Sequence, residues 1–210
     1  MSSDPIQITM TSFARFILAD AQSKMAQARS IRHQYEDGYS QGGDHWRYLR
    51  SEMHDLLMTG GPRSAVKAIP KGVRAKQRNA YDSACNGMFK FWGRKHLRLL
   101  GEPESRHWTY DRLEVKVNPE WLLDLDGVET VVKLHLRRDI PLTKRVADPL
   151  LSLMAVTFDA EASGLGVLDV HRGKLFSGTP HNRELAPVLE MQAAAFVVGW
   201  DAASRGASAA

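Results

Sequence analysis

The sequence has few of the features that mark a secreted or membrane-spanning protein. Cys85 is the single cysteine among 210 residues, so the chain cannot form an internal disulfide. The first residues also lack a basic stretch followed by an apolar core, and both observations favour a reducing, cytoplasmic setting. No apolar run approaches the roughly 20 residues that cross a bilayer, so we expect no membrane partner.

Motifs for several common chemistries are missing as well. The glycines of residues 164–166 precede a predicted strand instead of following one, which disfavours a phosphate-binding loop. No Gly-x-Ser-x-Gly sequence occurs, and the histidines show no metal-ligand spacing. These absences give little support to nucleotide hydrolysis, to a serine nucleophile or to a histidine-bound metal.

Acidic residues are nearly absent from one segment of an otherwise balanced chain. The formal net charge is +4, but residues 62–98 hold ten basic residues and one acidic residue, Asp82, a net charge of +9. Such concentration of one charge sign indicates a polyanionic partner. The alternative is a solvated helix whose cations pair with the acidic C-terminal half. The cations that we expect to contact a polyanion are Arg74, Lys76, Arg78, Lys90, Arg94, Lys95 and Arg98.

Hydrophobic periodicity predicts helices at both ends of the chain. Apolar residues recur at helical spacing over residues 11–32, 44–58, 74–100, 142–158 and 184–203. Residues 63–72 contain Pro70 and no acid, and are expected to form a flexible loop. The first 101 residues are therefore interpreted as an N-terminal helical region, residues 102–203 as an α/β core, and residues 204–210 as a frayed tail.

Three consecutive strands are predicted over residues 112–118, 121–126 and 129–137, where apolar and polar residues alternate. Pro119 ends the first strand, and Asp126-Gly127 is a strong signal for a tight hairpin between the next two. A fourth strand over residues 165–172 follows a predicted helix. A three-strand meander followed by a helical crossover indicates a mixed α/β sheet with helices packed on it.

One face of the third predicted strand carries Glu129, Val131, Lys133, His135 and Arg137. A charged row on a half-buried strand usually faces solvent. In the alternative interpretation, two carboxylates on neighbouring strands bind a divalent metal beside Lys133, which steadies a developing oxyanion. The carboxylates would be those of Asp124, one hairpin away, and Glu114, on the strand before.

This order of elements, with acids and a lysine on successive strands, resembles the PD-(D/E)XK nuclease superfamily. The resemblance covers about residues 112–200, with the helical front as an addition. In that family an acid on the second strand precedes an acid-x-Lys on the third, and the three residues bind a divalent metal and assist phosphodiester hydrolysis. The resemblance implies a restriction-endonuclease-like mixed sheet, and Mg²⁺ or Mn²⁺ as cofactor if the protein is catalytic.

The family pattern is incomplete in this chain. Asp124 in WLLDLDG matches the first acid and Lys133 in TVVKLHL matches the lysine, but Val131 stands where the family has Asp or Glu. A metal site that loses one of two carboxylates loses charge and a ligand together. Glu114 or Glu129 would have to replace it, and we take Glu114 with Asp124 as the metal ligands.

Three functions follow from these observations. The favoured one is a nuclease-fold protein that binds nucleic acid, DNA in preference to RNA, with degenerate or absent metal-dependent phosphodiesterase chemistry. The second is an active Mg²⁺- or Mn²⁺-dependent nuclease in which Asp124, Glu114 and Lys133 act together. The third is a non-catalytic module that binds a protein partner or takes part in assembly.

Overall fold

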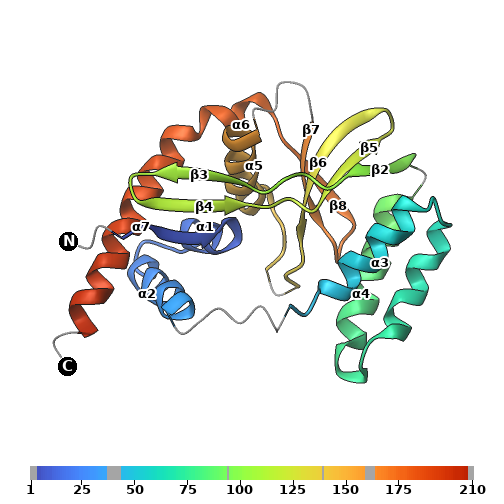
Figure 1. Ribbon diagram of the computed structural model, residues 1–210, viewed down its shortest axis with the longest axis horizontal. Helices are drawn as coiled ribbons and strands as arrows, with labels where there is room; N and C mark the ends of the chain where they lie inside the picture. The colour runs from blue at the N-terminus through green and yellow to red at the C-terminus, as the bar shows by residue number, and fades with distance from the viewer. Residues whose placement is uncertain (1–3, 37–43, 94, 139, 159–163, 208–210) are drawn as a thin grey trace.

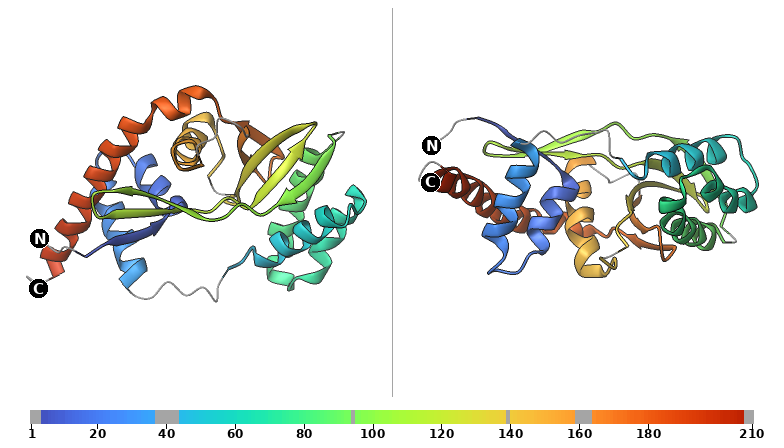
Figure 2. Two further views of the ribbon diagram at one scale, coloured as in Figure 1. Left: turned by 45° about the horizontal axis from the view of Figure 1, so that its top comes forward. Right: turned by 90° about the horizontal axis from the view of Figure 1, so that it is seen from below.

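The computed structural model describes the chain except residues 1–3, 37–43, 94, 139, 159–163 and 208–210. Over the described residues the protein is mixed α/β, with two mixed sheets and eight helices (Figure 1). Helix α7 lies at the opposite end of the molecule from helices α3 and α4 (Figures 1 and 2). In these residues no helix is both long and apolar enough to cross a membrane.

The elements have the following bounds. The strands are β1 (Ile6–Thr9), β2 (Leu97–Gly101), β3 (Arg106–Tyr110), β4 (Leu113–Val117), β5 (Trp121–Leu125), β6 (Val128–His135), β7 (Gly164–Asp169) and β8 (Lys174–Ser177). The helices are α1 (Met10–Leu18), α2 (Lys24–Glu36), α3 (Arg47–Met58), the 3₁₀ helix η2 (Arg63–Gly72), α4 (Ala75–Trp92), α5 (Lys144–Phe158), α6 (Pro180–Glu184) and α7 (Ala186–Ala207).

The strands form two separate sheets. The first has the order β1-β4-β3, with β1 parallel and β3 antiparallel to β4. The second has the order β2-β5-β6-β7-β8, in which only the β6–β7 pair is parallel. Helix α5 connects β6 to β7, so the predicted helical crossover between the third and fourth strands is confirmed.

The predicted three-strand meander is wrong, although each of its strands exists. β4 pairs with β1 and β3 in the first sheet, whereas β5 and β6 belong to the second, where β2 occupies the place beside β5. The chain changes sheet at Asn118 and Pro119, and proline has no N–H with which to continue a ladder. The Glu120 N–H then donates to the Val132 carbonyl at 2.9 Å, which starts the pairing of β5 with β6.

The N-terminal region is not purely helical. β1 and β2 are strands in it, and the single helix predicted over residues 11–32 is divided into α1 and α2. Asp20 causes the division, because its carboxylate accepts the Ser23 N–H at 2.8 Å and the Ser23 hydroxyl at 3.0 Å. Asp and Ser side chains that bond neighbouring backbone groups in this way favour turns over helix interiors.

The basic segment also differs from its prediction. The expected loop over residues 63–72 is the 3₁₀ helix η2, which buries Val66, Ile69 and Pro70. The helix expected to reach residue 100 ends at Trp92, because Gly93 takes a positive φ of 49° that glycine adopts without strain. At the far end, α7 continues to Ala207, into the tail expected to be frayed; residues 208–210 lie outside the described residues.

Two hydrophobic cores flank the second sheet. One joins the first sheet to α1, α2, α5 and α7, and the other joins the second sheet to α3, η2 and α4. The neighbours Val131 and Val132 on β6 point into different cores, so this strand is buried on both faces. Each core contains residues from both sides of position 101.

Helix α4 lies very close to the turn between β7 and β8. A Cβ atom at Gly87 would lie 1.9 Å from the Val170 carbonyl oxygen, so no larger residue fits without movement of the helix. The contact fixes α4 against the second sheet.

We expect Gly87→Ala to destabilise the protein by about 1–3 kcal/mol or more, because the methyl group meets backbone that cannot move aside. Urea unfolding followed by circular dichroism measures the change. Gly101→Ala is the matched control, since nothing lies within 4 Å of its added Cβ. Equal unfolding midpoints for the two variants would contradict the close approach.

Candidate functional site

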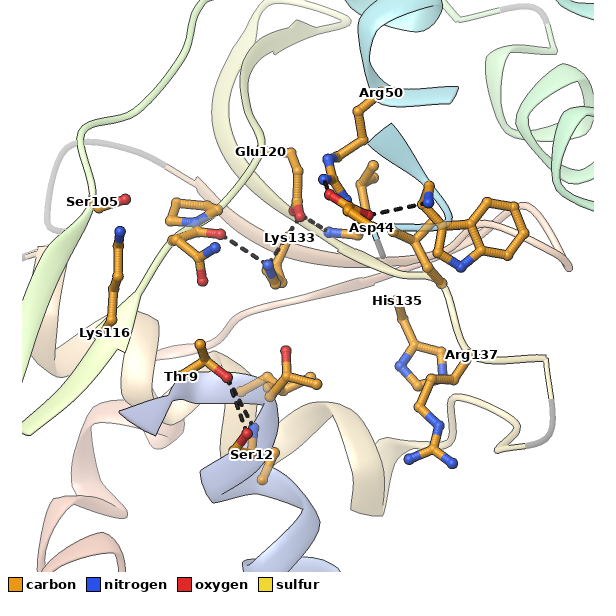
Figure 3. Close-up of a pocket in the computed structure, with 18 of the residues that line it drawn as sticks. Thr9, Ser12, Asp44, Arg50, Ser105, Lys116, Glu120, Lys133, His135 and Arg137 are labelled. Carbon is orange, nitrogen blue, oxygen red and sulfur yellow. Dashed lines mark hydrogen bonds and ion pairs between the residues drawn. The ribbon is translucent and has the colours of Figure 1, made fainter. Parts of the chain in front are cut away.

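A groove of about 1700 Å³ lies between the two sheets. Its volume exceeds the roughly 300–1,000 Å³ of common small-molecule sites, which suits an extended ligand. Residues of β1, β3, β4, β5 and β6, of helices α1, α2, α3 and α5, and of the segments between them line it (Figure 3). The charged lining side chains are six basic ones, Arg15, Arg47, Arg50, Lys116, Lys133 and Arg137, and four acidic ones, Asp44, Glu102, Glu114 and Glu120.

Lys133 pairs with Glu120 in this groove. Its Nζ donates to Glu120 Oε1 at 2.9 Å and to the Asn118 carbonyl at 2.9 Å, as Figure 3 shows. Glu120 Oε2 accepts the Leu134 N–H at 2.8 Å, so both oxygens of this carboxylate are occupied. The Lys133 and Glu120 side chains are 8% and 12% exposed, which makes this a buried ion pair.

Sequence reasoning missed Glu120, although the hairpin register contains the signal. Counting outward from the Asp126-Gly127 turn pairs Leu125 with Val128 and Trp121 with Val132. One further step places residue 120 opposite residue 133. The carboxylate that faces Lys133 could therefore have been found from the turn alone.

Asp124 lies on the same hairpin but away from Lys133. It is opposite Glu129, four residues from Lys133 along β6, and four residues of a strand span roughly 13 Å. Its carboxylate accepts the Gly127 N–H at 2.8 Å and an Arg98 N–H at 3.2 Å. These two donors, the Gly127 N–H first, lower the pKa of Asp124.

Glu114 belongs to the first sheet. It accepts a hydrogen bond from Gln7 Nε2 at 3.0 Å and contacts His107 Nδ1, and these partners lower its pKa. Val131, at the position of the missing acid, is buried in the core that contains α5. The structure therefore places Asp124 away from Lys133, whereas Glu114 and Lys133 both line the groove. Over the described part of the chain, no group of three or more His, Cys, Asp or Glu side chains is placed to hold a metal ion.

The cations of the basic segment are mostly free of carboxylates. Four exposed ones on and just before α4 form no ion pair with any described residue: Arg74, Lys76, Arg78 and Lys90. Arg98 lies on β2 and pairs with Asp124, while Lys95 donates to the Phe91 carbonyl at 2.8 Å. Arg94 lies outside the described residues. Among the described cations of this set, Arg98 is the one that pairs with an acid of the C-terminal half, Asp124.

The groove continues toward these cations. A smaller hollow of about 430 Å³ shares Asp44, His45, Arg47 and Ser51 with the groove, and Arg74 and Gln77 also line it. Arg47 and Lys116 form no ion pair with a described residue, and sequence reasoning did not single them out. One concave surface therefore extends from Lys116 and Lys133 to Arg74, at the start of α4.

His171 contacts three elements next to this surface: α4, the segment after β6, and Trp46 before α3. Its Nδ1 lies 3.0 Å from Ser83 Oγ on α4, and its Nε2 lies 3.2 Å from the Leu136 carbonyl, in the segment after β6. Burial is the main cause that lowers the pKa of this imidazole. The ring also contacts Trp46 edge to face, with centroids 5.5 Å apart.

No protein-family model matches this sequence, and a search of curated proteins found no significant match. The resemblance to PD-(D/E)XK nucleases therefore rests on its residues and the order of its elements.

We expect Glu120→Ala to lower the free energy of unfolding by about 3–5 kcal/mol, because it leaves the Lys133 ammonium buried without its carboxylate. Chemical denaturation measures the loss. The double variant Glu120→Leu, Lys133→Met removes both charges and should recover most of the stability. Asp124→Ala, which breaks the exposed Arg98 pair, should have a much smaller effect. A single variant as stable as the wild type would show that the pair is not buried as described.

We expect His171 to make stability depend on pH. The unfolded histidine takes up a proton near its ordinary pKa of about 6.5, whereas burial lowers the folded pKa. The unfolded state then binds more protons below about pH 6.5, so the free energy of unfolding falls as pH decreases through and below that value. His171→Asn should flatten this decline in urea titrations between pH 5 and pH 7.5. An unchanged slope in His171→Asn would contradict this dependence.

Proposed function

We propose that this protein binds nucleic acid in the groove and along the start of α4, without metal-dependent cleavage. The observation that carries the proposal is the continuous concave surface on which Lys116, Arg47 and Arg74 have no carboxylate partner among the described residues. Cations that are not already paired are the ones that can neutralise phosphates and release their counterions. DNA is the expected partner over RNA, in line with the nuclease resemblance.

The acids of the groove do not outnumber its basic side chains, and two of the four are ion-paired with an arginine or a lysine. Asp44 pairs with Arg50 and Glu120 with Lys133, while Glu114 contacts His107 and Glu102 lies 3.4 Å from His54 Nε2. The lining holds six basic side chains against four acidic ones, so a ligand meets a net positive charge. A field of one sign inside a concave surface raises the local concentration of an oppositely charged ligand.

The strand order supports a restriction-endonuclease-like arrangement for the second sheet. β2, β5 and β6 form an antiparallel run, α5 follows, and β7 returns parallel to β6. Under this proposal β2 takes the role expected for the first strand of the meander. The first sheet, with α1, α2 and α7, would be an addition that builds one wall of the groove.

Absence of cleavage is proposed because the residues of the nuclease pattern have other partners. Lys133 is held by Glu120 and Asn118, and Asp124 is held by Gly127 and Arg98. Incubation of the protein with labelled DNA and RNA and either Mg²⁺ or Mn²⁺ tests this part directly. Cleavage that disappears in Asp124→Ala would support the active-nuclease alternative instead.

We expect binding to short DNA to weaken steeply with salt, and Arg74→Ala, Lys76→Ala, Arg78→Ala together to reduce that dependence. Each lost phosphate contact lowers the slope of log K against log salt by about 0.7–0.9, so the triple variant should lose about two to three. Fluorescence anisotropy at several salt concentrations measures it.

The matched control removes the same charge from exposed positions on α2 and α5, through Arg29→Ala, Lys144→Ala and Arg145→Ala. It should change the salt slope little. Equal effects of the two triple variants would show that binding follows net charge and not this surface. Lack of any affinity for DNA or RNA at low salt would refute the function.

A further inference from the structure

Trp46 is a half-buried aromatic ring in the groove lining, at the residue before α3. One side of its indole stacks on Tyr81, with centroids 5.2 Å apart and planes at 23°. Tyr81 is 1% exposed, and its hydroxyl donates to the His45 carbonyl at 2.6 Å. The indole is therefore held in place before any ligand arrives, so a contact with it costs little conformational freedom.

Basic and ring-bearing side chains surround Trp46 in the lining. His45 and Arg47, its neighbours in sequence, are both exposed, and the His45 ring contacts the indole edge to face at 4.7 Å. Farther along the groove, Lys116 and Arg137 lie on different sides of the Lys133–Glu120 pair (Figure 3). The lining thus alternates groups that attract phosphates with rings that can stack on bases.

This combination separates two forms of nucleic acid. A duplex presents its phosphates outward and keeps its bases stacked inside, and proteins read it by inserting a helix or a two-stranded ribbon into its major groove. A concave surface with a ring inside would meet only the sugar–phosphate backbone of a duplex. A single strand offers unstacked bases, and proteins that bind it combine a basic groove with aromatic platforms.

We infer that the groove binds single-stranded nucleic acid, with a base stacked on Trp46, one phosphate bound by the adjacent Arg47 and another, farther along the strand, bound by Lys116. This inference depends on the proposed function, because it specifies the form of the ligand for the same surface. Stacking of one base on an aromatic ring contributes about 1–3 kcal/mol, and 1.4 kcal/mol corresponds to a tenfold change in affinity.

The test compares one oligonucleotide of about 15 nucleotides, near the upper site size of single-strand-binding domains, alone and annealed to its complement. Binding is measured by anisotropy at constant salt and by quenching of tryptophan fluorescence. We expect the single strand to bind at least tenfold more tightly than the duplex. Trp46→Leu should weaken binding to the single strand about tenfold and remove most of the quenching.

Trp92→Leu is the matched control, because Trp92 is also half-buried against the core of the second sheet but does not line the groove. It should leave affinity and quenching unchanged. Trp46→Phe retains an aromatic face and should retain most of the affinity, which distinguishes stacking from loss of packing. Urea unfolding of the three variants verifies that each is folded at the temperature of the titration.

The outcomes are distinguishable. Equal or tighter binding of the duplex, or equal effects of Trp46→Leu and Trp92→Leu, overturns the single-strand inference and leaves nucleic-acid binding intact. Absence of binding to both forms at low salt overturns the proposed function and this inference together.

Discussion

The hydrogen bonds of the Lys133 ammonium determine how the two sheets of this protein meet. Asn118 follows β4 of the first sheet and Glu120 precedes β5 of the second, and Lys133 on β6 bonds to both. One side chain thus joins the point at which the chain changes sheet to the strand that is buried on both faces. A buried ion pair adds little net stability, but breaking one is costly, so its geometry is strongly constrained. The groove is built over this junction.

The same pair explains why the groove suits binding more than catalysis. A lysine whose ammonium group already donates hydrogen bonds to a carboxylate and a carbonyl is a structural group. The other groove acids also have basic or histidine neighbours. What a ligand meets is the set of unpaired cations and the fixed indole of Trp46. Tyr81 belongs to α4, the basic helix, and its ring stacks on the indole of Trp46. The basic segment is therefore connected to the groove through a rigid aromatic contact.

Local patterns predicted much of the secondary structure and little of the pairing. Alternation identified β4, β5, β6 and β7, and helical spacing identified α3 and α5, because each pattern repeats within its own element. The short strands β1, β2, β3 and β8 were missed; β3, for example, contains Arg106 and His107 in a polar context. η2 was taken for a loop because Pro70 suggested a break, yet burial of Val66 and Ile69 in the core shared with α3 and α4 orders it.

The sequence by itself determined where β4 to β7 and helices α3 and α5 form, that the chain has a single cysteine, and the concentration of cations in residues 62–98. Only the tertiary structure decided that β4 joins β1 and not β5, that Glu120 and not Asp124 faces Lys133, and that Arg47, Lys116 and Trp46 share one groove with Arg74. The reason is the range of the interactions involved. Periodicity records which side of an element is apolar, whereas strand partners and ion pairs depend on groups that come from distant parts of the chain.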